Sequence, residues 1–213
     1  MLLRHPIFPY IIPFGTFLLF TGLTSLTPVS VVWLYPIKTV IVGLLLFMFR
    51  RTYTEIKLKV SLLAIVAGLV VFVLWVLPEG RYPTLGQPKE FNPFDKFASH
   101  SWSFVWIAFR LIGAVVVVPL MEELFWRSFL LRYLINPDFK QVPIGTFSWL
   151  SFCGTVVLFG LEHHQWLPGI VAGIIYTFLL YRKKELFDCI LAHAITNLAL
   201  GIFVLVTQKW VYW

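Results

Sequence analysis

The stretch that decides the fold runs from Trp102 to Ile135 and reads WSFVWIAFRLIGAVVVVPLMEELFWRSFLLRYLI. Its pattern is continuously helical and largely apolar. As one straight helix it would be about 50 Å long at about 1.5 Å per residue, which is too long for one upright crossing of a membrane. We therefore expect Pro119 to kink or break this helix.

The composition of the whole chain agrees with a membrane protein. Of its 213 residues, 59% are apolar and 13% are charged, whereas soluble proteins have about 45–50% apolar and about 25% charged residues. A disordered chain would be poor in hydrophobic and aromatic residues. Uninterrupted apolar runs mark membrane-spanning helices, because the strands of a membrane barrel alternate. The sequence predicts an all-α, polytopic transmembrane bundle that forms a single integral membrane domain over residues 1–213.

Six further apolar runs bring the number of predicted spans to about seven, with six and eight as alternatives. They cover residues 7–26, 29–49, 60–77, 144–163, 167–181 and 186–207. Lys38, near the start of its run, is interpreted as an edge residue whose amine reaches the membrane surface. Residues 78–101 are predicted to form an irregular surface loop, because five prolines and glycines occur through Pro88.

The positive charges predict a cytoplasmic N-terminus. In this orientation eleven lysines and arginines fall on the inner side and four on the outer side, in agreement with the positive-inside rule. The inner set is Arg4, Arg50, Arg51, Lys57, Lys59, Arg127, Arg132, Lys140, Arg182, Lys183 and Lys184, and the outer set is Arg81, Lys89, Lys96 and Lys209. The net charge of +7 is therefore interpreted as a signal of orientation, and no nucleic-acid partner is expected.

Three polar clusters interrupt the apolar C-terminal half. An ionisable group at the bilayer centre costs about 2.5–3.5 kcal/mol, so a chain that keeps several of them needs a reason. The first cluster is EELFWR at residues 122–127. Glu123 and Arg127 are four residues apart and can pair on one helix face, whereas Glu122 points elsewhere and is free for chemistry. The alternative is an ordinary charged helix end at the cytoplasmic boundary.

The second cluster is FGLEHH at residues 159–164, at the end of the fifth run. His163 in this cluster is a candidate either for catalysis or for a structural hydrogen bond at a helix interface. Glu162 and His164 are interpreted as flanking residues at the helix exit.

The third cluster lies inside the last run, where His193 and Asn197 share one helix face, one turn apart. Two hydrogen-bonding side chains on a spanning helix are unfavourable without partners. They could simply join neighbouring helices. Each cluster has a structural explanation of this kind, but three of them in one short chain favour a function.

In this order, the three clusters resemble the signature of the CAAX protease and bacteriocin-processing family of intramembrane proteases, which includes the type II CAAX prenyl endopeptidases. The family pattern is EExxxR, then FxxxH, then HxxxN. The matching residues are Glu122, Glu123 and Arg127, then Phe159 and His163, then His193 and Asn197. The resemblance covers about residues 110–205, and the segment 102–207 carries the motifs. Residues 1–100 share only hydrophobicity with the family.

The resemblance implies a role for each catalytic candidate. Glu122 and His163 would hold and deprotonate the attacking water, since a carboxylate kept from bulk water can serve as a base near neutral pH. His193 and Asn197 would donate hydrogen bonds to the developing oxyanion, an effect typically worth about 3 kcal/mol per donor. No serine or cysteine has a suitable partner, so no covalent nucleophile is expected.

The implied enzyme is an intramembrane endopeptidase in which Glu123 and Arg127 support the first motif. Its substrate would be a membrane-associated protein or peptide in the lipid bilayer, with prenylated CAAX-type chains as one candidate class. The compact size and the absence of a eukaryotic-style targeting extension fit a prokaryotic inner membrane.

A divalent metal is left open by the sequence. Glu122, His163 and His193 are possible ligands, but the HExxH motif is absent and no second ligand follows at short spacing on one helix. The expectation is therefore a site without a cofactor. Cys153 and Cys189 lie in apolar runs without zinc spacing and are expected to be buried free thiols.

The depth of the motifs in the membrane raises a difficulty for one shared site. In the simple topology, His163 falls at the outer end of its span and Glu122 near the inner side. Convergence requires either a deeper crossing of the helix that carries Glu122 or a short or tilted fifth span. Two other functions also stay open: a non-catalytic family member that acts as an immunity or scaffold protein, and a proton-coupled transporter.

Overall fold

The computed structural model describes residues 5–24, 30–86 and 90–212. Regular structure within these ranges is entirely helical, which confirms the predicted all-α bundle. The long helices follow the predicted runs closely: α1 (Phe8–Thr24), α2 (Ser30–Phe49), α3 (Leu62–Val76), α8 (Trp149–Glu162), α9 (Trp166–Lys183) and α10 (Leu186–Thr207). Three residues lie outside the described ranges: Arg4 and Lys89, which were counted in the charge distribution, and Pro88, which was counted in the predicted loop.

Most of the stretch from Trp102 to Ile135 lies in one long helical rod, His100–Tyr133. It consists of α5 (His100–Ile112), α6 (Val118–Glu123) and α7 (Leu131–Tyr133), joined by two π-helical segments, Gly113–Val117 and Leu124–Leu130. Of the expected kink or break at Pro119, the break is wrong, because the helix continues through this residue. The wider π turn just before this proline has the Val118 N–H donating to the Gly113 carbonyl, so the missing proline N–H is accommodated without ending the helix.

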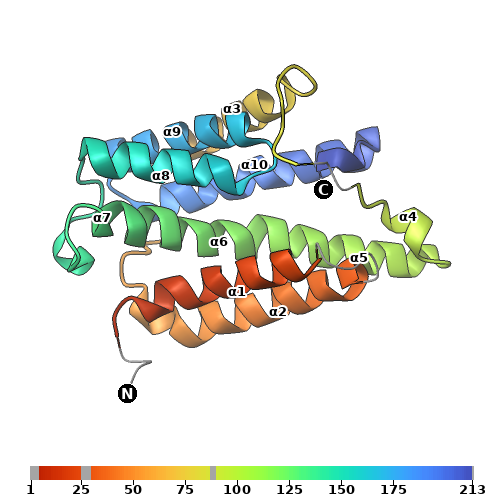
Figure 1. Cartoon of the computed structure of the whole chain (residues 1–213), viewed down its shortest axis with the longest axis horizontal. Helices are drawn as coiled ribbons and strands as arrows, with labels where there is room; N and C mark the ends of the chain where they lie inside the picture. Colours follow the sequence, from red (N-terminus) through yellow and green to blue (C-terminus); the bar gives the residue numbers. More distant parts are fainter. Residues whose placement is uncertain (1–4, 25–29, 87–89, 213) are drawn as a thin grey trace.

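The long rod divides the bundle into two groups of helices. Figure 1 shows α5, α6 and α7 running through the middle, with α1 and α2 along one side and α3, α8, α9 and α10 along the other. Among the described residues, three helices are long and apolar enough to cross a membrane: residues 31–52, 100–133 and 186–207. Shorter apolar helices lie at residues 8–23, 62–76 and 149–162.

The outer faces of the helices are strongly apolar, while polar side chains are buried inside. Trp33, Leu44, Trp149 and Val206 are among the large apolar side chains that are mostly exposed. A soluble monomer rarely exposes an apolar surface of this extent. The distribution therefore fits a protein surrounded by lipid, and the chain is an integral membrane protein.

Two charges that were assigned to the inner membrane boundary lie inside the protein instead. Arg127 is fully buried and paired with Glu123, and Arg132 is nearly buried and lies 3.8 Å from Glu55. Neither arginine therefore reports on orientation, because each is held by an internal carboxylate. The cytoplasmic position of the N-terminus stays a prediction that rests on the remaining loop charges.

Two smaller expectations also need correction. Cys189 is buried as expected, but Cys153 is exposed on α8, where a thiol can face lipid as a small apolar group. The segment 78–101 is irregular only in part, because it includes the short helix α4 (Pro93–Lys96) and the start of α5. Asn92 caps α4 by accepting a hydrogen bond from the Phe94 N–H at 3.0 Å.

Close helix contacts beside the second and third polar clusters depend on glycine. A Cβ atom at Gly160 would lie 2.3 Å from Ile170 Cγ1 and 3.0 Å from the Trp166 carbonyl oxygen. A Cβ atom at Gly68 in α3 would lie 2.4 Å from the Ala192 carbonyl oxygen of α10. These contacts bring α9 against α8, and α3 against α10, at the level of the second and third polar clusters.

Candidate active site

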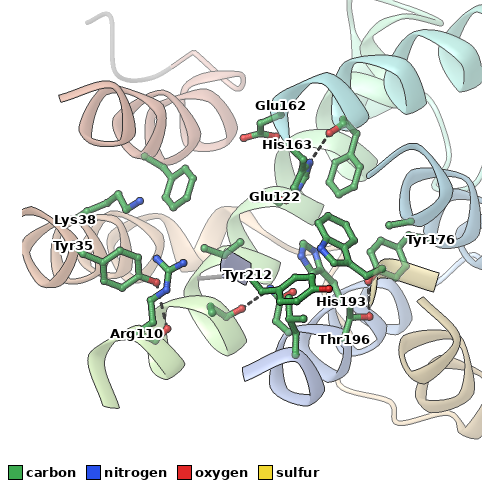
Figure 2. Close-up of a pocket in the computed structure, with 18 residues that line it drawn as sticks. Tyr35, Lys38, Arg110, Glu122, Glu162, His163, Tyr176, His193, Thr196 and Tyr212 are labelled. Atoms are coloured by element: carbon green, nitrogen blue, oxygen red, sulfur yellow. Dashed lines mark hydrogen bonds between the residues drawn. The ribbon is translucent and has the colours of Figure 1, made fainter. Parts of the chain in front are cut away.

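A cavity of about 230 Å³ lies inside the bundle and collects side chains from all three polar clusters. Glu122, His163 and His193 line it (Figure 2), and Asn197 lines it as well. They come from α6, from the end of α8 and from α10. The structure therefore brings together the four residues that the sequence selected as catalytic candidates.

The short fifth span removes the difficulty of depth. α8 has 14 residues, so it is only about 21 Å long, and it begins at Trp149 instead of at residue 144. Because α8 runs back along the long helix from its α7 end, Glu162 comes level with Trp126, whose Nε1–H donates to Glu162 Oε2 at 3.1 Å. The next residue, His163, thus reaches the middle of the bundle. Its irregular backbone lines a protein cavity, which is where a membrane protein tolerates it.

Glu122 is a buried carboxylate that lines the cavity. Its side chain is 3% exposed, and Oε2 has no hydrogen-bond partner among the residues that the structure describes. Within the described ranges no ion pair includes Glu122. A buried carboxylate oxygen without a partner is unfavourable, and here that oxygen belongs to a residue that lines the cavity.

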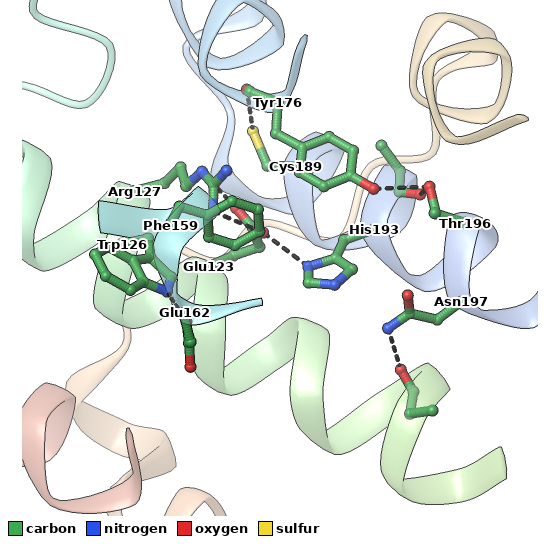
Figure 3. Close-up of polar contacts among 12 residues, drawn as sticks. Glu123, Trp126, Arg127, Phe159, Glu162, Tyr176, Cys189, His193, Thr196 and Asn197 are labelled. Atoms are coloured by element: carbon green, nitrogen blue, oxygen red, sulfur yellow. Dashed lines mark hydrogen bonds and ion pairs between the residues drawn. The ribbon is translucent and has the colours of Figure 1, made fainter. Parts of the chain in front are cut away.

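Glu123 joins two of the motifs (Figure 3). Arg127 Nε lies 3.2 Å from Glu123 Oε2, and His193 Nδ1 lies 2.9 Å from Glu123 Oε1. The predicted pairing of Glu123 with Arg127 is confirmed. The link to His193 was not predicted, because it joins residues 70 positions apart in the chain. It fixes the imidazole ring by a hydrogen bond from Nδ1.

Phe159 explains the four-residue spacing of the second motif. Its carbonyl oxygen lies 2.7 Å from His163 Nδ1, so Nδ1 carries the proton and Nε2 presents a lone pair. Its ring lies 4.1 Å from the Arg127 guanidinium carbon. One residue thus orients the histidine through its backbone and covers the Glu123–Arg127 pair with its ring.

The first π turn and Pro119 leave a backbone carbonyl oxygen available to accept a hydrogen bond from Asn197. Because the Val118 N–H bonds to Gly113 and Pro119 has no N–H, the Ala114 carbonyl is left to accept another donor. Asn197 Nδ2 donates to this oxygen at 2.7 Å. The amide keeps a second N–H for a ligand in the cavity.

A second layer of contacts fixes the face of α10. The Tyr176 hydroxyl donates to Thr196 Oγ1 at 2.7 Å, and Thr196 Oγ1 lies 2.8 Å from the Gly68 carbonyl oxygen. The Tyr176 ring also stacks on His193, with 5.3 Å between ring centres. The sequence reasoning missed Tyr176 and Thr196, since only the packing of α9 and α3 on α10 brings these groups together.

Two interpretations made from the sequence are wrong at this site. Glu162 lines the cavity, because the end of α8 lies inside the bundle and not at a membrane exit. Lys38 also lines the cavity and is only 6% exposed, so its amine does not reach a membrane surface. His164, in contrast, lies outside the cavity lining, as expected of a flanking residue. A ring nitrogen of His164 is hydrogen-bonded to the Leu85 carbonyl oxygen, in the segment between α3 and α4.

No group of three or more His, Cys, Asp or Glu side chains in the described part of the chain is arranged to hold a metal ion. Glu122, His163 and His193 share the cavity, but Nδ1 of each histidine is already engaged, with the Phe159 carbonyl and with Glu123. The donor groups left for a ligand are Nε2 of each ring and the Glu122 carboxylate.

Fold and cavity together define an integral membrane protein whose bundle encloses a carboxylate, two histidines and an asparagine. A family model described as Type II CAAX prenyl endopeptidase Rce1-like matches residues 100–199. This match covers all three motifs and confirms the resemblance noted in the sequence. A comparison with curated proteins and another with solved structures gave no match.

Proposed function

We propose that this chain is an intramembrane endopeptidase that hydrolyses a peptide bond of a membrane-associated protein, with prenylated CAAX-type chains as the first candidate substrates. The observation that carries the proposal is the convergence of Glu122, His163, His193 and Asn197 on one cavity within the lipid-facing bundle. The family match supports a protease in general. We place the enzyme in a prokaryotic inner membrane.

In the proposed reaction, Glu122 and the Nε2 atom of His163 hold a water molecule between them. The carboxylate takes a proton as the water oxygen attacks the carbonyl carbon of the scissile bond. The same proton then passes to the leaving amine when the carbon–nitrogen bond breaks. No covalent enzyme intermediate is needed, so the peptide is divided into a carboxylic acid and an amine by one water molecule.

His193 and Asn197 stabilise the tetrahedral intermediate in this proposal. Asn197 offers the N–H that it does not donate to Ala114. His193 donates from Nε2 when both ring nitrogens carry protons, and Glu123 is the anion placed to balance that charge. Donors that are fixed before the reaction give the largest stabilisation of developing negative charge, and both side chains are fixed by the contacts described above.

The proposal is tested by the new protein termini that appear in membranes. Cells that lack the protein are supplied with the wild-type chain, with Glu122→Gln or with His163→Ala, and their membrane fractions are compared by terminal proteomics. Termini that appear only with the wild-type chain support the proposal. Glu90→Gln and His100→Ala are matched controls on exposed residues outside the cavity, and both should retain the wild-type pattern.

The two alternative functions, a scaffold or immunity protein and a proton-coupled transporter, predict different results. A scaffold or immunity role predicts that Glu122→Gln restores the phenotype completely and that no termini depend on Glu122. A transporter predicts uptake that follows a pH gradient in liposomes without any cleavage. Either result would contradict the proposed protease.

A further inference from the structure

A second cavity, the α2 groove, lies between α2 and the first π segment of the long helix and has a volume of about 470 Å³. It shares no lining residue with the catalytic cavity, and its volume is within the roughly 300–1,000 Å³ of common ligand pockets. One wall is a single helix face, because Gly43, Leu46, Phe47 and Arg50 follow one another at helical spacing. The groove therefore runs along α2 toward Arg50, where a 3-10 turn follows the helix.

The opposite wall of the α2 groove belongs to the long helix. Val116, Val117 and Leu120 form this wall. Phe47 and Val116 are mostly exposed, so in a membrane they face hydrocarbon and the groove opens toward lipid. Since apolar side chains make up most of the lining, a hydrocarbon chain suits this groove better than a polar ligand does.

Arg50 is the one charged residue among the described residues that line the α2 groove. Its guanidinium carbon lies 3.9 Å from the centre of the Phe47 ring, and Nη1 donates to the Phe47 carbonyl oxygen at 2.8 Å. These two contacts hold the guanidinium group at the end of the groove. Arg50 is exposed, and no ion pair in the described part of the chain includes it. A guanidinium group has five N–H donors, so several remain for a ligand.

The segment between α2 and α3 adds further positive charge around the groove. Its exposed cations are Arg50, Arg51, Lys57 and Lys59. Leu58, which lies between the two lysines in the sequence, lines the groove and is mostly exposed. Apolar and positive side chains that alternate in this way suit the boundary between hydrocarbon and lipid headgroups.

The acidic residue of this segment does not neutralise these cations. Glu55 is the one acidic residue in residues 50–61. Its Oε1 accepts a hydrogen bond from the Tyr10 hydroxyl at 2.8 Å and lies 3.8 Å from Arg132 Nη2. The carboxylate is thus engaged by groups of α1 and α7, and the outer surface of the segment is left positive. Such a surface attracts anionic lipids.

We propose that the α2 groove binds one anionic phospholipid, with part of an acyl chain between α2 and the long helix and the phosphate on Arg50. A guanidinium group matches a phosphate through two parallel hydrogen bonds. A zwitterionic lipid would bring its own ammonium group into basic surroundings, where it is repelled. Phosphatidylglycerol has no such cation. The site lies outside the catalytic cavity, and binding there does not depend on the proposed protease function.

The α2 groove and the catalytic cavity lie against the same turn of the long helix. Val116 and Val117 line the groove, whereas Ala114 and Val118 line the cavity. A lipid in the groove would therefore pack against the π turn between them. Because a ligand that binds only the folded state stabilises it, the lipid should raise the unfolding temperature.

Native mass spectrometry of the first bound lipid tests the proposal. The full chain is purified in detergent, delipidated and titrated with dioleoyl-phosphatidylglycerol or dioleoyl-phosphatidylcholine. Phosphatidylglycerol should bind about 10-fold more tightly, which corresponds to about 1.4 kcal/mol. It should also raise the unfolding temperature more than phosphatidylcholine does at equal concentration. Equal affinities for the two lipids would overturn the proposal.

Substitutions of arginine separate a specific site from a general charge effect. Arg50→Gln should reduce the preference to about twofold or less, whereas Arg50→Lys should keep most of it because an ammonium group also binds phosphate. Arg182→Gln removes another exposed arginine, near the end of α9 and outside the groove, and should keep the full preference. An equal loss in Arg182→Gln would overturn the proposal, because it would show attraction to net charge alone.

Filling the groove tests the position of the acyl chain. A Cβ atom at Gly43 would meet Val117 Cγ2 at 3.8 Å, an ordinary contact, so a leucine side chain there can extend into the groove. Gly43→Leu should weaken binding of both lipids about 10-fold. Gly15→Leu in α1, where an added Cβ has no packing neighbour within 4 Å among the described residues, should not.

Three further outcomes would contradict the proposal. Undiminished binding in Gly43→Leu would place the lipid elsewhere. Competition by glycerol 3-phosphate would show that a headgroup binds without its acyl chains. Displacement of phosphatidylglycerol by an equal concentration of farnesol, a prenyl chain without a phosphate, would assign the groove to a neutral chain. Failure of farnesol and of glycerol 3-phosphate to compete would support a site that requires both parts of the lipid.

Discussion

Glu123 is the side chain on which the geometry of the site depends most. Its carboxylate serves both Arg127 and His193, and all three groups are buried. Replacing this carboxylate leaves a buried arginine without its partner, which is destabilising by about 3–5 kcal/mol. A role in positioning His193 adds an effect on activity that a purely structural residue would not have.

We therefore predict that Glu123→Gln lowers kcat about 100-fold or more, because His193 loses the anion that balances a second ring proton. Hydrolysis and thermal unfolding are measured on the same purified protein. Unchanged kcat in a protein with reduced thermal stability would assign Glu123 a structural role only. Glu90→Gln is the matched carboxylate control and should change neither quantity.

Individual residues could be predicted from the sequence only where the contact is local. The Glu123–Arg127 pair follows from four-residue spacing on a helix. The bond from His193 to Glu123, and the burial of Lys38, depend on how distant helices pack. No spacing rule within one helix contains that information, so the residue types of the site could be predicted but their distant partners could not.

At the level of the helix, Pro119 and the π turn before it set the position of the first and third motifs. Pro119→Ala supplies an N–H that can bond within the helix, either to Ala114 or in the ordinary α-helical register. We predict that the unfolding temperature stays equal or rises, because alanine suits a helix better than proline. We also predict that kcat/KM falls, because the new N–H competes with Asn197 for the Ala114 carbonyl oxygen. Wild-type activity in Pro119→Ala would show that this carbonyl has no role, and Pro13→Ala in α1 is the control.

The close contact between α8 and α9 at Gly160 should be sensitive to a single added methyl group. Gly160→Ala places a methyl group against Ile170 and the Trp166 carbonyl. Overpacking of this kind costs typically about 1–3 kcal/mol, and here it displaces the turn that carries His163. The unfolding temperature and the rate of hydrolysis should both decrease. Gly15→Ala in α1, where an added Cβ would have no packing neighbour within 4 Å among the described residues, should leave both unchanged.

The sequence predicted where helices lie better than it predicted their internal geometry. Apolar runs fixed most boundaries within a few residues, since hydropathy follows the helix directly. The start of α8 at Trp149 and the π segments of the long helix were not predicted. Both depend on hydrogen-bond register and tertiary packing, and neither changes the apolar pattern of the chain.

At the scale of the whole molecule, the bundle has a lipid-facing apolar surface and a polar interior. Its composition predicted the membrane environment, because few charges and many apolar residues suit no other fold class. The arrangement of α1 and α2 on one side of the long helix, which brings Lys38 to the cavity, could not be predicted (Figure 1). Hydropathy specifies the number of helices and leaves their neighbours undetermined.

Because the proposed reaction uses only side chains and water, the activity of the protein should not depend on a metal ion. Treatment with EDTA or 1,10-phenanthroline, followed by removal of the chelator, should leave kcat/KM within about twofold of the untreated protein. Loss of activity that returns on addition of Zn²⁺ or another divalent ion would assign a metal to Glu122, His163 and His193 instead.

The most direct test of a single shared site is a double-mutant cycle with Glu122→Gln and His163→Ala in purified protein reconstituted into liposomes. If both residues act on one water molecule, each single change should lower kcat/KM about 100- to 10,000-fold, and the double variant should be no worse than the weaker of the two single variants. Losses that multiply in the double variant would contradict the shared site, because they would show that Glu122 and His163 act independently.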